Sequence, residues 1–131
     1  MSGSSGELLA GALRSLDAAI VAARADERYA AAHLAALRAA AAVLAHDARS
    51  DVRSGHRRPT SAWTLLARVA PDLAEWAAFF AAGTNKRIAA QAGMISAVSE
   101  READDLVRET SQFISLVAGR LGAPHHLVIT A

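Results

Sequence analysis

The sequence predicts an all-α protein, an up-and-down bundle of four or five helices, and three features of the chain support this prediction. Alanine, the residue with the highest helix propensity, makes up about a quarter of the 131 residues. Aromatic residues account for only 5% and β-branched residues are few, so the composition does not favour strands. Apolar residues also recur at helical spacing over several long segments, most of which are joined by short connections.

The composition narrows the class of protein. A length of 131 residues suits one domain, which we expect over residues 7–122, between a flexible leader (1–6) and a C-terminal tail (123–131). The net charge of +1 is too small to predict general attraction to nucleic acid or anionic lipid. No cysteine is present, which excludes disulfides and thiolate metal sites and suits a reducing cytosol.

The chain also lacks the features of a secreted or membrane-spanning protein. Its first residues have neither the basic start nor the apolar run of a signal peptide. No window of about 18 to 20 residues is free of charge, as a membrane span would require. We therefore expect a soluble, cytoplasmic protein that needs no metal or cofactor.

Two helices are predicted in the first part of the chain. The first, over about residues 7–23, has one apolar stripe that consists of Leu9, Leu13, Leu16 and Ile20. Asp26 is a candidate N-cap for the second, which runs to about Ala48. Its sequence over residues 27–44, ERYAAAHLAALRAAAAVL, is rich in alanine and nearly apolar on every side. A helix of this kind is typically a central one, buried against several neighbours.

The next segments are a long loop and a long helix. Residues 49–60 show no periodicity and contain several arginines, so we expect a basic loop. Over residues 61–82 the apolar positions keep one helical phase through Pro71, which predicts a single helix kinked at that proline. Gly83 is a plausible end for this helix.

Two more helices complete the predicted bundle. A short one over residues 85–92 is closed by Gly93. In the last one, Ser99 and Glu102 have the spacing of a capping box, and the helix continues to about Leu121. Its predicted buried positions are Ala103, Leu106, Thr110, Phe113 and Val117.

The chain resembles an actinobacterial family of small HEPN proteins, named for higher eukaryotes and prokaryotes nucleotide-binding. The resemblance covers about residues 26–121 and rests on ERYAAAHLAALRAAAAVL, the basic loop, SAWTLLARVAPDLAEWAAFFAAG and EREADDLVRET. The block that contains Trp63, Pro71 and Trp76 is its most distinctive part. This resemblance implies a four- or five-helix bundle that often forms a homodimer.

Arg28 and His33 are the candidate catalytic residues. Active HEPN ribonucleases carry an arginine followed, four to six residues later, by a histidine, and they need no metal; Arg28 and His33 have four residues between them. A histidine can move the proton of a ribose 2′-hydroxyl, and an arginine can stabilise charge that develops on a phosphate. On a regular helix, however, positions five apart point about 140° away from each other. Joint action would therefore require a frayed first turn or a dimer.

A structural interpretation of the same two residues stays open. In it, His33 lies at the edge of the core with one nitrogen hydrogen-bonded, and Arg28 is solvated or salt-bridged. The family's motif usually lies on a late helix and has a polar residue after the arginine, whereas this pair lies on the second helix and Tyr29 follows Arg28. Both differences favour the structural interpretation.

The basic loop offers candidate phosphate-binding residues. Guanidinium groups can hold phosphates through forked hydrogen bonds, and the loop contains Arg49, Arg53, Arg57 and Arg58. Asp47 and Asp51 dilute this charge, and no aromatic side chain is available there to stack on bases. A solvated linker is the alternative interpretation.

Three functions are therefore considered. The first is a non-catalytic helical module that binds a partner, which is itself, another protein, or RNA through the basic loop. The second is a metal-independent endoribonuclease that uses Arg28 and His33. The third is a purely structural protein-interaction bundle. The position of the Arg28 and His33 pair favours the first.

Overall fold

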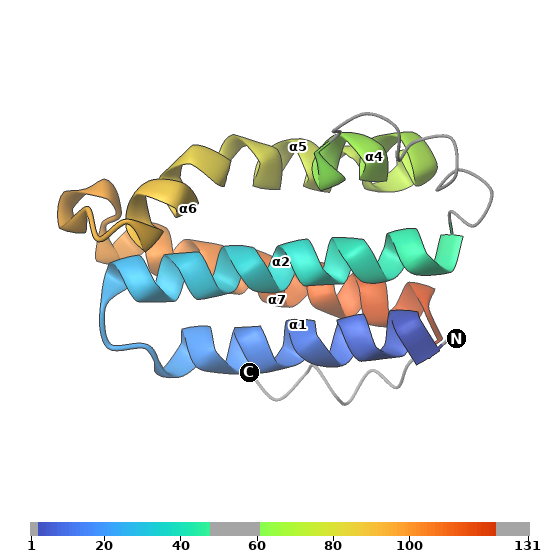
Figure 1. The fold of residues 1–131 in the computed structure, drawn as a ribbon, viewed down its shortest axis with the longest axis horizontal. Coiled ribbons are helices and arrows are strands. Elements are labelled where there is room, and N and C mark those ends of the chain that lie inside the picture. Colours follow the sequence, from blue (N-terminus) through green and yellow to red (C-terminus); the bar gives the residue numbers. More distant parts are fainter. Residues whose placement is uncertain (1–2, 48–60, 123–131) are drawn as a thin grey trace.

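The computed structural model describes residues 3–47 and 61–122, and all of its regular elements are helical (Figure 1). The predicted all-α bundle is therefore confirmed. In chain order, the elements are α1 (Gly3–Val21), α2 (Ala25–Asp47), α4 (Ala62–Val69), η1 (Pro71–Leu73), α5 (Ala74–Ala82), α6 (Thr84–Gln91), η2 (Ile95–Ala97) and α7 (Glu100–Arg120). None of these helices is long and apolar enough to cross a membrane.

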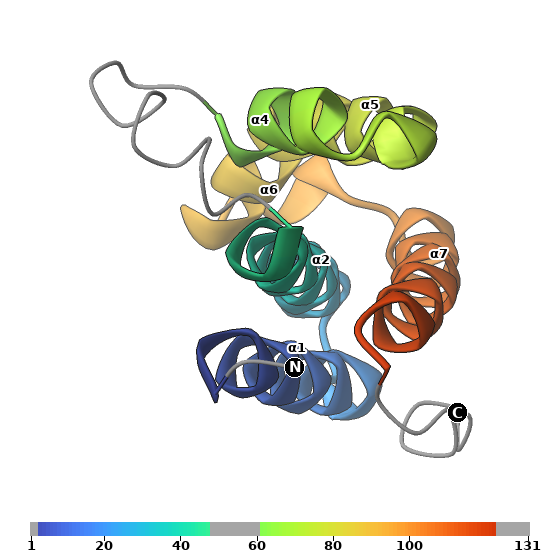
Figure 2. The ribbon, with the colours of Figure 1, turned by 90° about the vertical axis from the view of Figure 1, so that its right-hand side faces the viewer.

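Helix α2 is the centre of the bundle, as its composition predicts. It contacts α1, α4, α6 and α7, and the end-on view in Figure 2 shows it packed between these neighbours. One face stays open, because Glu27 and Arg38 are exposed and Leu34 is only partly buried. Its alanines make this possible, because a methyl group lets another helix approach closely. The side chains of α2 that are entirely removed from solvent are Ala32, His33, Ala35, Ala36, Ala39, Ala40, Ala42 and Val43.

Aromatic side chains fill the space on one side of α2. Phe80 of α5 lies at the middle of this cluster and has no solvent exposure. Its ring centroid is 5.2 Å from that of Trp63 on α4 and 5.1 Å from that of Phe113 on α7. Trp76 packs on Phe113 as well, at 5.5 Å. Large rings contribute most of the apolar area in such a core, so this cluster holds α4 and α5 against α7.

The predicted single helix over residues 61–82, kinked at Pro71, is wrong in one respect. The chain does bend at this proline, but the bend is a complete break: α4 ends at Val69, and Ala70 has φ −129° and ψ 78°. A residue that precedes proline is sterically disfavoured in the helical region, and Pro71 has no amide hydrogen to continue the helix. A 3₁₀ turn follows, and α5 then packs against α4. The apolar residues keep one helical period across the break because α4 and α5 both bury their apolar side chains in the same aromatic cluster.

Helix α1 begins earlier than its apolar stripe indicates. It starts at Gly3, so residues 3–6 belong to the helix rather than to the flexible leader that we expected. The side chain of Ser5 has no solvent exposure, which places this first turn in the packed part of the bundle. Residues 1–2 and the predicted tail, 123–131, lie outside the described residues.

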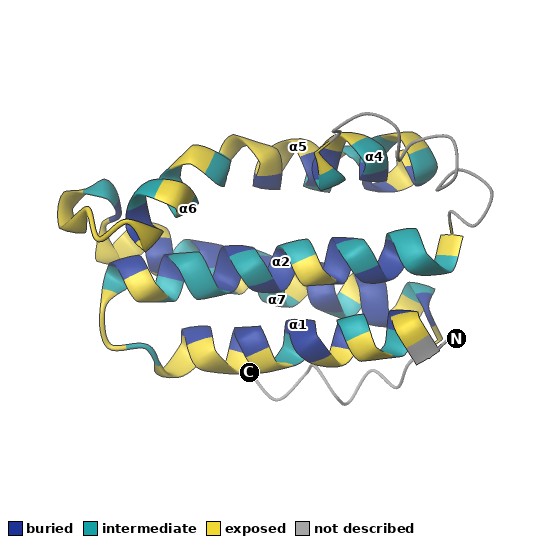
Figure 3. Ribbon diagram, in the orientation of Figure 1, coloured by how far each residue is buried: buried dark blue, intermediate teal, exposed yellow. Residues whose placement is uncertain are grey.

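The predicted caps have different outcomes. Asp26 is not an N-cap, because α2 already begins at Ala25 and the Asp26 side chain accepts hydrogen bonds from Arg24. The capping box is confirmed: the Ser99 hydroxyl accepts from the Glu102 amide, and the Glu102 carboxylate accepts from the Ser99 amide. The five positions predicted as buried on α7 are all buried (Figure 3). Gly93 follows α6 with φ +85°, a conformation that favours glycine.

The junction of α5 and α6 requires a residue without a side chain. Gly83 lies between the two helices, and a Cβ atom placed there would come within 2.6 Å of the Tyr29 hydroxyl oxygen and 3.4 Å of His33 Cδ2. Tyr29 is only 7% exposed, so its hydroxyl has little room to retreat. The contact connects the first turns of α2 to the end of α5.

This contact predicts a paired effect on stability. Gly83→Ala should lower the free energy of unfolding by about 1–3 kcal/mol, the usual cost of overpacking, and Tyr29→Phe should remove at least half of that cost by deleting the hydroxyl. Urea denaturation of the two single variants and the double variant measures the coupling.

Gly11→Ala is the matched control for this cycle. Gly11 lies inside α1, and a Cβ there would meet neighbouring atoms at 3.6 Å, an ordinary contact distance. Because alanine is the better helix former, this variant should gain about 0.5–1 kcal/mol. If Gly83→Ala lowered the free energy of unfolding equally in the wild type and in Tyr29→Phe, the close contact with the hydroxyl would not be the cause of the loss.

Candidate functional site

Arg28 connects the start of α2 to α7 and to the preceding connection. Its Nη1 donates to Glu100 at 2.9 Å and to Asp104 at 3.1 Å, both on α7. Its Nη2 donates to the carbonyls of Ala22 and Ala23, at 3.1 and 3.3 Å. The hydrogen bond to Glu100 raises the pKa of Arg28 above its ordinary value. The guanidinium thus donates to four acceptors, and the Arg28 side chain is only 14% exposed.

His33 lies one and a half turns further along α2 and is completely buried. Nε2 is 2.8 Å from the carbonyl oxygen of Phe80, and Nδ1 accepts a hydrogen bond of 3.0 Å from Nε of Arg87 on α6. Because arginine can only donate, Nδ1 carries no proton and Nε2 donates to Phe80. Burial lowers the pKa of His33, and the nearby positive charge of Arg87 acts in the same direction. His33 is thus held as one neutral tautomer.

The structure does not bring Arg28 and His33 together. Arg28 contacts α7 and the α1–α2 connection, whereas His33 contacts the end of α5 and the middle of α6. Among the residues that the structure describes, none is a hydrogen-bond partner of both side chains. The structural interpretation expected one bonded nitrogen on His33, and the structure gives it two.

Arg87 is the partner that sequence reasoning missed. It lies 54 positions after His33, on a short helix whose pattern gives no hint of a contact with α2. It also donates to Gln91 at 2.9 Å. Tyr29 stacks on the His33 ring, with centroids 6.4 Å apart and planes at 11°. The sequence spacing of Arg87 and His33 does not indicate that they are in contact, and only the folded structure shows it.

The other predicted site residues cannot be located. Arg49, Arg53, Arg57 and Arg58 all lie outside the described residues. Within residues 3–47 and 61–122, no group of three or more histidine and acidic side chains is placed to hold a metal ion.

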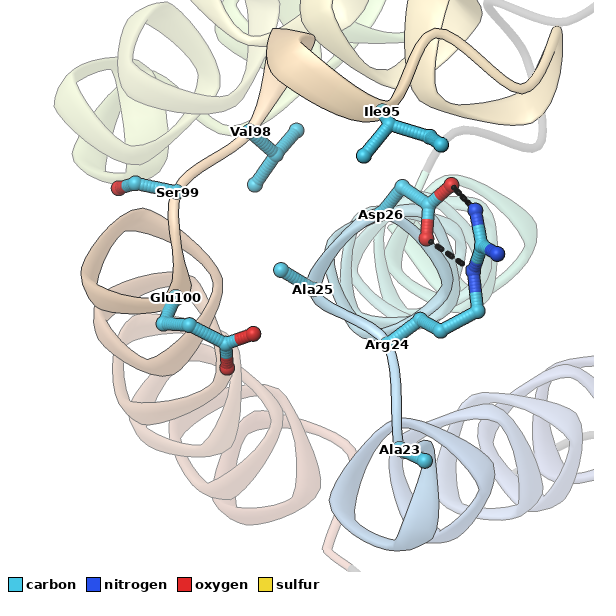
Figure 4. A pocket seen from close by; sticks show the side chains of 8 residues that line it. All are labelled: Ala23, Arg24, Ala25, Asp26, Ile95, Val98, Ser99 and Glu100. Atoms are coloured by element: carbon cyan, nitrogen blue, oxygen red, sulfur yellow. Dashed lines mark hydrogen bonds and ion pairs between the residues drawn. The ribbon is translucent and has the colours of Figure 1, made fainter.

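A cavity of about 460 Å³ lies at one end of the bundle, between the α1–α2 connection and the start of α7 (Figure 4). Two carboxylates line it, and each has an arginine partner. Arg24 binds Asp26 through two hydrogen bonds of 3.0 and 2.7 Å, which lowers the pKa of this carboxyl. Glu100 is bound by Arg28. Ile95 and Val98 supply an apolar wall. With both carboxylates already paired, the cavity presents no free acid or base for catalysis.

The state of His33 predicts that acid weakens the fold. Its pKa lies below 6.5 in the folded protein, so the unfolded chain takes up this proton at the higher pH. The stability that neutral His33 contributes is therefore fully present above about pH 6.5 and is lost as the pH falls below it. Urea midpoints at about pH 7.5 and about pH 5.5 should show the loss.

Two glutamine variants separate this residue from other acid effects. His33→Gln removes the titration and should reduce the change between the two pH values. His46→Gln removes a partly exposed histidine that pairs with Asp47, and His33→Gln should reduce the change more than this variant does. An identical urea midpoint of the wild type at both pH values would contradict the assignment.

Comparison with known proteins identifies the family. The model of the HEPN_SAV_6107-like HEPN family matches residues 18–118, which includes all of α2, the helices from α4 to α6 and nearly all of α7. Searches of curated proteins and of solved structures found no match. The matched region is well over half of the chain and contains both Arg28 and His33. The chain therefore belongs to the HEPN_SAV_6107-like family of HEPN proteins.

Proposed function

We propose that this protein is a non-catalytic HEPN module that binds a partner protein. The observation that carries the proposal is the environment of His33, whose two ring nitrogens are bonded to Phe80 and Arg87 in a site without solvent exposure. A general base has to come within hydrogen-bond reach of the proton that it removes. For His33 to reach a ribose hydroxyl, α5 or α6 would have to move away from α2.

The contacts of Arg28 support the same proposal. A cation that stabilises a phosphate must have donors free to face it. Four hydrogen bonds already engage the terminal nitrogens of Arg28, and two of their acceptors are backbone carbonyls. The arginine thus acts as a structural connection between three segments of the bundle.

Family membership favours a second candidate function. HEPN proteins include metal-independent ribonucleases, and the spacing of Arg28 and His33 matches their motif. This function would require the two side chains to leave their present partners, or a dimer to supply one of them in trans. HEPN domains often dimerise, so a second copy of the chain is also a candidate partner. RNA contact through Arg49, Arg53, Arg57 and Arg58 is a further form of binding that remains a proposal.

An RNA-cleavage assay distinguishes the two functions. A single-stranded RNA with a fluorophore and a quencher is incubated with the full chain in the presence of EDTA, which suppresses metal-dependent nucleases. We expect no cleavage above the buffer rate by the wild type. Cleavage that disappears in both His33→Gln and Arg28→Lys, while His46→Gln retains it, would overturn the non-catalytic proposal.

The same variants have an expected effect on stability. Arg28→Lys keeps the charge but loses the fork that reaches two carboxylates and two carbonyls, so it should lower the free energy of unfolding by about 1–3 kcal/mol. Urea denaturation at neutral pH measures this. A stability equal to that of the wild type would mean that the four contacts of Arg28 are not structural.

A further inference from the structure

A groove with an aromatic floor and acidic rims runs between α5 and α7. It consists of two adjoining hollows, of about 200 and 290 Å³, that share Phe79. Among the exposed large apolar side chains of the described residues, Phe79 is the aromatic one, at 46%. The residues that line the two hollows are Tyr29, Glu75, Trp76, Phe79, Lys86, Glu102, Asp105, Leu106 and Glu109. We call this surface the α5–α7 groove.

The floor of the α5–α7 groove is rigid. Trp76 packs on Phe113 of α7, and Phe79 meets the edge of Phe80 at a centroid distance of 5.1 Å. Phe80 and Phe113 are themselves completely buried in the aromatic cluster. The apolar surface that the groove presents is therefore preformed, which lowers the ordering cost of binding.

The rims carry an excess of negative charge. Glu102 is bound by Lys86 at 2.5 Å, and Asp105 is bound by Arg108. Glu75 on α5 and Glu109 on α7, which line the same hollow as Trp76 and Phe79, have no hydrogen-bond or ion-pair partner among residues 3–47 and 61–122. The two carboxylates and the aromatic surface beside them are therefore the part of the groove that is available to bind a partner.

From this arrangement we infer that the α5–α7 groove is the docking surface for a basic amphipathic helix of a partner protein, an inference that rests on the proposed binding function. A helix can lie in a groove between two helices and place an apolar side chain on an exposed aromatic ring. Glu75 and Glu109 select a positive charge, and a guanidinium is the group that can bond carboxylates while it stacks on Trp76 or Phe79. RNA does not fit this surface, because the carboxylates repel phosphates.

The inference is tested with a defined peptide. The probe is a fluorescein-labelled helical peptide of about 14 residues, with leucines at helical spacing on one face and arginines beside them. Its counterpart has a glutamate in place of each arginine. Fluorescence anisotropy with the full chain should show binding of the arginine peptide alone. Affinity should fall when NaCl is raised from about 50 to about 300 mM, because the rim charges are exposed.

Variants of the groove identify where the probe binds. The double variant Glu75→Gln and Glu109→Gln should weaken binding by about tenfold without affecting the fold, since both side chains lack partners in the described residues. Phe79→Ala should weaken it by about fivefold or more. The matched controls lie on α1: Glu7→Gln with Asp17→Asn for the charges, and Ile20→Ala for the apolar side chain, because Ile20 is 47% exposed. These controls should leave affinity unchanged.

Three outcomes of the peptide experiment would overturn this inference. The first is no binding of the arginine peptide, and the second is equal binding of the glutamate peptide. The third is binding that the groove variants leave intact; the probe then docks elsewhere and the proposed binding function survives. Self-association that the groove variants abolish, measured by analytical ultracentrifugation, would assign the groove to a second copy instead. The RNA-cleavage assay decides the proposed function independently of all these results.

Discussion

The structure depends on a buried polar group in the alanine-rich helix α2. His33 is the completely buried histidine at the centre of α2, and its two hydrogen bonds run to the last turn of α5 and to α6. A buried polar side chain is costly unless its partners are in place, so the positions of these two helices relative to α2 are coupled through it. The alanines around His33 let the neighbouring helices come close enough for both bonds to form. The same constraint removes the imidazole from any role at the surface.

Much of the fold could be predicted because its determinants are local. The capping box of α7 depends on residues three positions apart, and the buried stripe of that helix is visible as a period in the sequence. The central place of α2 follows from its alanine-rich composition, because small side chains on several faces let several helices approach it closely. The break at Pro71 could not be recognised as complete, because the apolar phase of α4 and α5 continues through it. Only the packing of the two helices against each other reveals the reversal.

The site could be predicted only in part, because its contacts are distant in sequence. The spacing of Arg28 and His33 singles out these two residues but does not show which partners they have. Arg28 finds Glu100 and Asp104 72 and 76 positions away, and His33 finds Arg87 54 positions away. A motif of two residues cannot show whether its side chains are free or already bonded. The arginines of the basic loop lie outside the described residues, so their role stays a prediction.

The core of this HEPN protein is unequal on the two sides of α2. The aromatic rings all lie toward α4, α5 and α7, whereas α1 buries only small and aliphatic side chains, of which Leu9 and Leu16 are the largest. Side chains of this size remove less apolar area from water per residue than aromatic rings do. The free energy of local unfolding should therefore differ along the chain, and α1 should detach at a lower cost than the other helices. Its amide hydrogens would then exchange with deuterium before those of α7.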